Sequence, residues 1–294
     1  MKDRRLELTV TQAQNVGLLL RRELNCSAAV VRTAKKYPDG ILLDGVHATT
    51  ADSARPGQML SILISDREDG DLEPAEGPVE FAYQDEDMLV INKAAGVAVH
   101  PSPGHHADTL GNFLTDYYKK QGIPFVFRPA NRLDRGTSGL MVAARHAHAQ
   151  ELLKHQLHTG AFRRVYLAVC QGIPGQEKGI VDMPIGRADG SVLLRQVRAD
   201  GARAVTHYKV LSVHGDRSLV RLELETGRTH QIRVHMAWLG CPLVGDFLYG
   251  VEDKALIGRT ALHSWQLAVT QPLTGERLEL TAPLPEDMEK LLQT

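Results

Sequence analysis

The first 65 residues combine a helical and an extended pattern of apolar side chains. One face of a predicted helix at 12–24 is apolar, through Val16, Leu19, Leu20 and Leu24. Ser27 can cap a second helix that runs to about Lys36, because its hydroxyl accepts from free backbone N–H groups. Two short apolar runs, at 41–43 and 59–64, predict strands. We therefore expect a small α/β module over residues 1–65.

After residue 78 the apolar runs become short and numerous, which is typical of strands. Strands are expected at 79–84, 88–92, 140–144, 164–170, 204–212, 219–225, 265–270 and 278–281. Helices are expected at 108–118, 147–158 and 229–238. A regular alternation of strands and helices, which would indicate a doubly wound parallel sheet, is missing. We predict an α+β fold in which residues 79–294 form a mixed, mainly antiparallel sheet with flanking helices.

The sequence between these two parts is acidic. Residues 66–78 carry six Asp and Glu against one Arg, a net charge of −5, and they include Pro74 and Pro78. We interpret this segment as a solvated linker. Residues 1–65 carry nine Lys and Arg against six Asp and Glu, a net charge of +3. The overall charge of −1 therefore neither supports nor excludes a nucleic-acid partner, which would need a local basic groove.

The composition narrows the classes of protein. Hydrophobic residues are 43% of the 294, enough for a sizeable buried core. No apolar stretch follows the charged residues 1–5, so no signal peptide is predicted. No segment approaches the roughly 20 apolar residues of a membrane span. Cys26, Cys170 and Cys241 lie far apart without metal-ligand spacing, as expected of buried thiols in a reducing compartment, so we predict a cytoplasmic protein.

Residues 131–140, Asn-Arg-Leu-Asp-Arg-Gly-Thr-Ser-Gly-Leu, carry the clearest chemistry. They place the carboxylate of Asp134 between two guanidinium groups, and Gly136 and Gly139 permit unusual backbone angles. A nearby arginine keeps a carboxylate ionised, and an ionised, oriented Asp can serve as a nucleophile or base. Judged by composition alone, a structural ion pair is the commoner explanation of such a group.

The order of residues in this string closely resembles the RLD-x-x-T-S-G signature of the RluA-type RNA pseudouridine synthases. Other strings resemble further motifs of that family in the expected order: 91–101, 164–168, 224–236, 245–250 and 262–263. The resemblance extends from about residue 80 to the C-terminus. Either Ala94 or Ala95 stands where the family usually has Pro, and Asn131 stands where it commonly has His. We expect the change at Asn131 to alter local hydrogen bonding and not the reaction.

The resemblance implies an isomerase that detaches uracil from its ribose, turns it and rejoins it through carbon, without a cofactor. It implies that Asp134 is the catalytic carboxylate and that Arg233 is its basic partner. Tyr166 would stack on the target uracil and help to move the C5 proton. In a helix at 229–238, the apolar stripe would face the core and leave Arg233 on another side.

Four residues are expected around the substrate. By resemblance, Arg132 fills the space that the everted uridine leaves in the RNA stack, because flipping a base costs a few kcal/mol. Arg228 is a candidate for a phosphate contact or a structural ion pair. Ile232 and Leu262 are candidates for apolar walls of the pocket.

The N-terminal module loosely resembles the alpha-L type RNA-binding domain, in which two helices present basic side chains to RNA. The corresponding residues here are Arg21, Arg22, Arg32, Lys35 and Lys36. Their alternative role is that of a solvated helical surface. The expected partner is structured RNA, with large-subunit ribosomal RNA favoured and transfer RNA as the other candidate. The motifs imply a self-contained site and hence a monomer.

Two other functions fit parts of the sequence. A non-catalytic RNA-binding or ribosome-associated protein would keep the fold, but it would have no need of the three implied catalytic residues. A metal-dependent hydrolase is suggested by His148, Glu151 and His155, which would share one helix face. Because no further ligand with a matching signature accompanies them, we expect no metal site.

Overall fold

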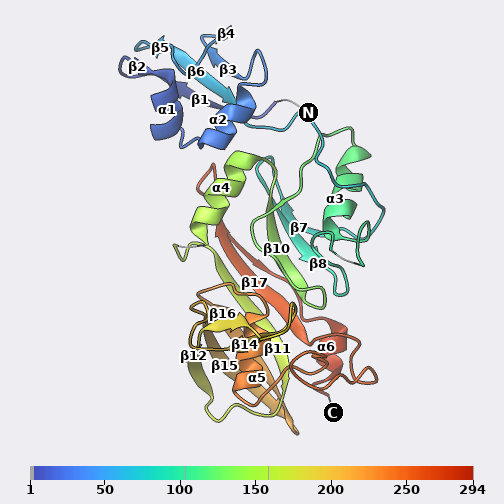
Figure 1. Cartoon of the computed structure of the whole chain (residues 1–294). Helices are drawn as coiled ribbons and strands as arrows, with labels where there is room; N and C mark the ends of the chain where they lie inside the picture. Colours follow the sequence, from blue (N-terminus) through green and yellow to red (C-terminus); the bar gives the residue numbers. More distant parts are fainter. Residues whose placement is uncertain (1–2, 103, 158, 294) are drawn as a thin grey trace.

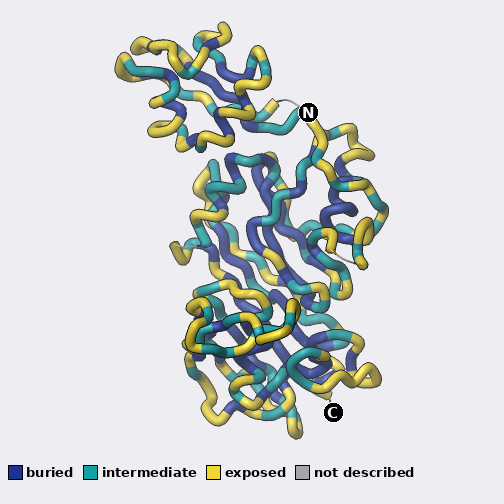
Figure 2. Tube along the Cα trace, in the orientation of Figure 1, coloured by how far each residue is buried: buried dark blue, intermediate teal, exposed yellow. Residues whose placement is uncertain are grey.

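The computed structural model describes residues 3–102, 104–157 and 159–293. A small N-terminal module lies beside a larger domain that is built around one long, twisted sheet (Figure 1). The buried residues follow the strands of this sheet, while the loops around it are exposed (Figure 2). Together with the helices at its flanks, this confirms the predicted α+β fold.

The N-terminal module pairs a four-stranded sheet with two helices. Within the described residues the strand order is β1 (Arg5–Thr9), β6 (Met59–Leu63), β3 (Ile41–Leu43) and β4 (Val46–His47). The helices are α1 (Val16–Arg22) and α2 (Ala28–Ala34), and β2 (Gln14–Asn15) pairs with β5 (Ser53–Ala54). The predicted Ser27 cap is confirmed, because its Oγ accepts from Val30 N at 3.3 Å. The first helix begins later than predicted, since Gln14 and Asn15 belong to a strand and Asn15 caps the helix.

The large sheet has ten strands within the described residues, and eight of them form a continuous path. In order, the path is β12 (Lys178–Asp182), β15 (Val205–His214), β16 (Arg217–Leu224), β11 (Arg163–Gln171), β17 (Leu262–Thr270), β10 (Ser138–Ala144), β8 (Met88–Lys93) and β7 (Phe81–Gln84). Two strands lie off it: β18 (Arg277–Thr281) pairs with β17, and β9 (Arg128–Pro129) pairs with β10. Every described pairing in this sheet is antiparallel except that of β10 with β17.

Four helices and one hairpin complete the described part of the large domain. They are α3 (Leu110–Lys119), α4 (Ala147–Gln156), α5 (Gln231–Trp238), α6 (Glu286–Lys290) and the hairpin of β13 (Ile185–Arg187) with β14 (Arg195–Val197). Thr109, not Asp108, caps α3, because its hydroxyl and the Asn112 side chain form a reciprocal capping box. The helix predicted to reach His158 ends at Gln156, and His158 lies outside the described residues. Among the described residues, no helix combines the length and apolar character needed to cross a membrane.

Residues 66–78 contain no helix or strand, but they are not simply solvated. Asp66 forms an ion pair with Arg128, and Asp69 accepts a hydrogen bond from Phe125 N at 3.0 Å. Leu72 packs against the large hydrophobic core of the larger domain. The segment is therefore attached to the larger domain by these side chains and is not a purely solvated linker, although about half of its residues are exposed. Its acidic side chains gave a strong signal of solvation, whereas the few contacts that hold it have no distinctive pattern.

A buried carboxylate joins the N-terminal module to the larger domain. Asp87 is 1% exposed and accepts from Arg4 of the module at 2.9 and 3.0 Å. His146 and Gln271 also contact it, at 3.0 and 2.7 Å. Burial alone would raise the pKa of Asp87, but hydrogen bonds from His146, Arg4 and Gln271 hold that pKa below its usual range. The module is therefore fixed at this joint and not merely tethered.

Replacing Arg4 by Met should lower the free energy of unfolding by about 1–3 kcal/mol, because Asp87 loses two charge-assisted hydrogen bonds. Urea denaturation monitored by circular dichroism measures the change. Arg203→Met is the matched control, since Arg203 forms an exposed pair with Glu225 and such pairs contribute little. Equal unfolding free energies for the Arg4 and Arg203 variants would show that the joint does not depend on Arg4.

Candidate active site

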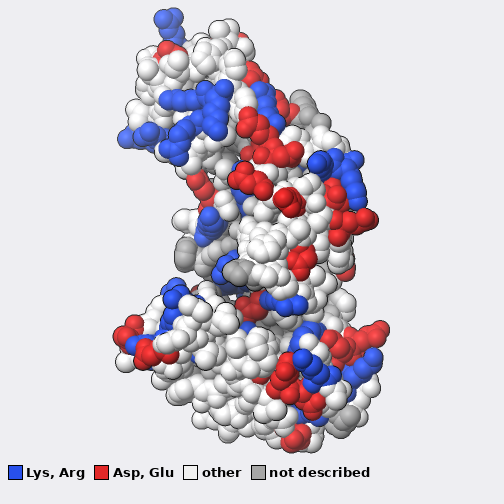
Figure 3. All heavy atoms as spheres, turned by 45° about the vertical axis from the view of Figure 1, so that its right-hand side comes forward, with Lys and Arg blue, Asp and Glu red and all other residues white. Residues whose placement is uncertain are grey.

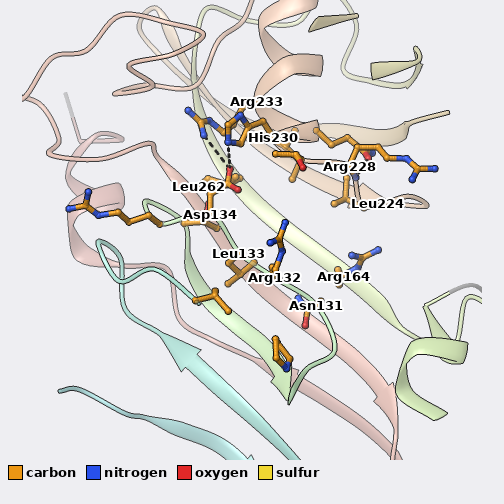
Figure 4. Close-up of a pocket in the computed structure, with 18 of the residues that line it drawn as sticks. Asn131, Arg132, Leu133, Asp134, Arg164, Leu224, Arg228, His230, Arg233 and Leu262 are labelled. Carbon is orange, nitrogen blue, oxygen red and sulfur yellow. Dashed lines mark hydrogen bonds and ion pairs between the residues drawn. The ribbon is translucent and has the colours of Figure 1, made fainter. Parts of the chain in front are cut away.

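One cleft of about 870 Å³ gathers the residues of the sequence motifs. Its wall is formed by the loop between β9 and β10, by strand β11 and by the segment that leads into α5 (Figure 4). Asp134, Tyr166, Arg233, Arg132, Arg228, Ile232 and Leu262 all line it. The structure therefore brings together all seven candidate catalytic and substrate-binding residues of the large domain.

Asp134 presents its carboxylate to this cleft with 33% of the side chain exposed. Arg233 Nη1 donates to its Oδ2 at 3.2 Å, and His230 Nε2 lies 3.8 Å from the same oxygen (Figure 4). The Asp134 carbonyl accepts from Thr137 N at 3.0 Å, which closes the turn that leads into β10. The expected pairing of Asp134 with Arg233 is present.

Arg233 is held in place by a second carboxylate. Its Nε and Nη2 each donate to Asp246 at 2.7 Å, a bidentate ion pair in which both side chains are buried. Burial would lower the pKa of Arg233, yet its hydrogen bonds to Asp246 and Asp134 raise that pKa. Arg233 therefore stays charged and leaves only Nη1 to face Asp134. Sequence reasoning placed Asp246 in a late motif without giving it a role, because nothing in the sequence pairs it with Arg233.

His230 approaches Asp134 from an unusual backbone conformation. His230 directly precedes α5, and its backbone has φ 58° and ψ 18°. Residues other than Gly rarely adopt this left-handed conformation. Its Nδ1 lies 2.8 Å from the Tyr249 hydroxyl, which also accepts from Arg195 N at 2.9 Å. Burial lowers the pKa of His230, with Asp134 opposing this effect, so the ring is largely neutral near pH 7. The positive φ also makes α5 begin at Gln231, later than predicted.

Tyr166 lies on β11 with its ring in the apolar part of the cleft. It is 5% exposed and belongs to one hydrophobic cluster with Leu133, Ile232 and Leu262. Burial raises the pKa of Tyr166, so the phenol remains protonated near neutral pH. The predicted apolar walls, Ile232 and Leu262, therefore line the same cleft as the predicted stacking residue and belong to the same hydrophobic cluster.

The two arginines predicted to contact substrate are exposed at the cleft. Arg132 lies between Asn131 and Leu133 in the loop. Burial lowers the pKa of His100, and the charge of Arg132 lowers that pKa further. Arg228 donates its Nε to the Arg203 carbonyl at 2.9 Å, so its guanidinium is anchored at the rim. No carboxylate partner of Arg228 is present among the described residues, which leaves its charge available to a ligand.

A buried lysine, Lys93, is hydrogen-bonded to the backbone of the loop that carries Asp134. It is 1% exposed, and its Nζ donates to the carbonyls of Ala94 and Val97 at 2.8 Å and of Arg135 at 3.3 Å. Three acceptors match the three N–H groups of an ammonium ion. Burial lowers the pKa of Lys93 to about 7, aided by Arg259 and opposed by Asp134. Sequence reasoning passed over this lysine although it lies within a quoted motif.

The remaining site predictions lie elsewhere or concern metals. Arg21, Arg22, Arg32, Lys35 and Lys36 are exposed on or next to α1 and α2, and none lines the cleft. Basic side chains gather on one face of this module (Figure 3). Within the described chain, no group of three or more His, Cys, Asp or Glu is arranged to hold a metal ion.

Comparisons with known proteins identify the family. The sequence pattern described as RNA pseudouridylate synthase matches residues 87–238. An uncharacterized RNA pseudouridine synthase of Bacillus subtilis (strain 168), YjbO, is 40% identical over 92% of this chain and 96% of its own. Ribosomal large subunit pseudouridine synthase D of Xanthomonas campestris is 38% identical over 85% of this chain and 80% of its own. The solved structure of human RNA pseudouridylate synthase domain containing 1 superposes with a TM-score of 0.59 and 27% identity, covering 72% of this chain and 86% of that one.

The chain therefore belongs to the RNA pseudouridylate synthase family, and within it to the RluA type. It is an RNA pseudouridine synthase, an isomerase that converts uridine in RNA to pseudouridine. The resemblance of the motifs to that family is confirmed.

The buried Lys93 should make stability depend on pH. Above pH 7 the folded Lys93 is largely neutral while the unfolded side chain stays protonated up to about pH 10, so unfolding takes up a proton. The unfolding free energy should therefore rise with pH, relative to Lys93→Met, by up to about 1.4 kcal/mol per pH unit.

Urea denaturation at several values between about pH 7 and 9 measures this difference. Lys254→Met, at a lysine whose side chain is 76% exposed, is the matched control and should follow the wild type. A Lys93→Met variant whose stability changes with pH in parallel with the wild type would contradict the perturbed pKa.

Proposed function

We propose that Asp134 is the catalytic carboxylate of this pseudouridine synthase and that large-subunit ribosomal RNA is its substrate. The observation that carries the proposal is the partly exposed Asp134 carboxylate, held by a buried Arg233 at 3.2 Å inside the cleft. The neighbouring cation favours the ionised form, and its second ion pair fixes the direction of approach. The Xanthomonas campestris relative, whose name specifies the ribosomal large subunit, supports this substrate over transfer RNA.

In the proposed reaction, the ionised Asp134 assists cleavage of the bond between uracil N1 and ribose C1′. The uracil turns within the cleft and its C5 bonds to C1′, while C5 loses a proton and N1 gains one. Substrate and product contain the same atoms and electrons, so the proposed reaction consumes no oxidant, reductant or group donor. Arg233 stabilises the negative charge that Asp134 carries before and after its attack.

The apolar part of the cleft would hold the uracil. Tyr166 would stack on the ring, and its protonated hydroxyl would relay the C5 proton. Ile232 and Leu262 would enclose the opposite side and exclude water from the reacting atoms. These residues share one buried cluster, which supports a common role.

Two exposed arginines and the N-terminal module would bind the rest of the RNA. Arg132, in the same loop as Asp134, would fill the gap left by the everted uridine, and Arg228 would contact a phosphate at the rim. The three cysteines are free and buried, which supports a reducing, cytoplasmic location.

Replacing Asp134 by Ala should reduce turnover by about 10⁴-fold or more, since the variant lacks the attacking carboxylate. The assay is release of tritium from C5 of uracil in separate transcripts of ribosomal and transfer RNA. Asp71→Ala, at an exposed acidic residue of segment 66–78, is the control and should behave as wild type. A folded wild type that releases no tritium from either RNA would instead support a non-catalytic RNA-binding protein, or a substrate assembled with ribosomal proteins.

Replacing Arg21, Arg22, Lys35 and Lys36 together by Glu should weaken RNA binding and leave turnover at saturating RNA nearly unchanged. These side chains are exposed and remote from the cleft residues, so their contribution would come from phosphate contacts. Filter binding at several salt concentrations measures the affinity, and single-turnover tritium release measures the chemistry. Unchanged affinity combined with slower turnover would rule out the module as an RNA anchor.

A further inference from the structure

Arg164 is a buried cation without a counterion. The residue is 8% exposed, and its Nε is enclosed without a hydrogen-bond partner. Within residues 3–102, 104–157 and 159–293 its guanidinium forms no ion pair and no hydrogen bond. The guanidinium does lie over the ring of Phe162 in a cation–π contact, with the ring centroid 5.8 Å from Cζ. Its Nη1 and Nη2, which open onto the cleft, also have no protein partner among the described residues and can therefore receive the oxygens of an anion.

Other arginines of the same region are neutralised. Arg233, the other buried arginine of the described chain, contacts both Asp246 and Asp134. Arg163, next to Arg164 on β11 and pointing to the opposite face of the sheet, forms a bidentate pair with Glu223 at 2.6 and 2.9 Å. The nearby Glu223 is therefore already engaged, and the missing partner of Arg164 is not supplied by this part of the protein.

A second unpaired donor lies in the same cleft. Asn131 is 7% exposed, and its Oδ1 accepts from Val142 N at 2.9 Å. That hydrogen bond fixes the orientation of the amide, because a backbone N–H can only donate. The Nδ2 group is consequently a donor, and it is buried without a partner among the described residues. The expected effect of Asn131 on local hydrogen bonding thus takes the form of an unused N–H group.

Both donors lie at the same end of the cleft. Asn131 and Arg164 line it away from Arg233 and His230, with Arg132 in the same region (Figure 4). Gly227 provides the space, because a Cβ on it would lie 3.0 Å from Arg164 Nη1. Arg164 and Tyr166 are two positions apart on β11. Because side chains alternate between the faces of a strand, these two leave the same face of the sheet, about 7 Å apart.

We propose that Arg164 and the Nδ2 group of Asn131 form a subsite for one backbone phosphate of the RNA, beside the everted uridine. The assignment rests on the proposed function only in that Tyr166 marks where the uracil lies. Both groups can only donate hydrogen bonds, so the ligand must present acceptors. The buried positive charge selects an anionic acceptor over a base carbonyl, and a guanidinium matches two oxygens of a phosphate.

The test compares Arg164→Met with its neighbour Arg163→Met as the matched control. Both variants are made in an Asp134→Asn background, so that RNA binding is measured without turnover. The probe is the ribosomal or transfer RNA transcript that releases tritium with the wild type, and filter binding gives its Kd at several salt concentrations. Thermal unfolding of the free proteins is recorded in parallel. Tritium release by the wild type tests the proposed function, whereas the Kd values of the variants test the subsite. A negative result in one assay is therefore distinguishable from a negative result in the other.

The subsite predicts that Arg164→Met raises Kd about tenfold or more. The slope of log K against log salt should become shallower by about 0.7–0.9, the value for one phosphate contact. Its Tm should not fall below that of the parent, because an unpaired buried cation has been removed. Arg163→Met should keep the parent's Kd and salt slope. An unchanged Kd and slope in Arg164→Met would overturn the proposal, as would a Tm several degrees lower, which would show that Arg164 stabilises the free protein.

Asn131→Asp provides a second variant that retains the shape of the side chain. Its carboxylate can still accept from Val142 N, but it would repel a phosphate bound at Arg164. We expect Kd to rise by about tenfold, with the loss becoming smaller as salt screens the repulsion. A Kd equal to that of the parent at low salt would remove Asn131 from the subsite.

Discussion

The geometry of the active site depends on the buried ion pair between Arg233 and Asp246. Asp246 is fully buried and is itself fixed by the backbone N–H groups of Leu248 and Tyr249, at 3.0 and 3.2 Å. It therefore determines where two of the three guanidinium nitrogens of Arg233 must lie. The third nitrogen points at Asp134 as a consequence. The planar, bidentate contact thus fixes the position of helix α5, which carries Arg233, relative to the segment that carries Asp246. Through Nη1 of Arg233 it also fixes the helix relative to the Asp134 loop.

The two carboxylates on Arg233 differ in burial and in the number of hydrogen bonds that they accept. Asp246 accepts four hydrogen bonds, three at Oδ1 and one at Oδ2, and has no exposed surface, so it is closed to a substrate. Asp134 receives one longer hydrogen bond from the same arginine and keeps a third of its side chain exposed. One carboxylate therefore sets the position of the cation, while the other retains free lone pairs for a substrate.

The periodicity of apolar residues predicted the class of fold and most strands, because it depends on local sequence. The residues of the cleft were predicted from the resemblance of the motifs to a known family. Neither could predict that Asp246 binds Arg233 or that Asp87 joins the two parts of the chain, since both contacts depend on tertiary packing. The acidic residues 66–78 were misread as freely solvated because composition does not reveal tertiary contacts. Both side chains and backbone groups of this segment bind the larger domain. The left-handed His230 likewise has no signal in its residue type.

The loop of Asp134 is held chiefly through its main chain. The carbonyl of Arg135 accepts from Lys93 Nζ and Gly96 N, and that of Gly136 accepts from Arg259 Nη1. These hydrogen bonds go to backbone carbonyls and therefore do not depend on which side chains the loop carries. Loop residues whose side chains face the solvent could be exchanged during evolution without displacing the carboxylate. RNA preference could then diverge among relatives while the bond-making step is inherited unchanged, so that one scaffold could serve many target uridines.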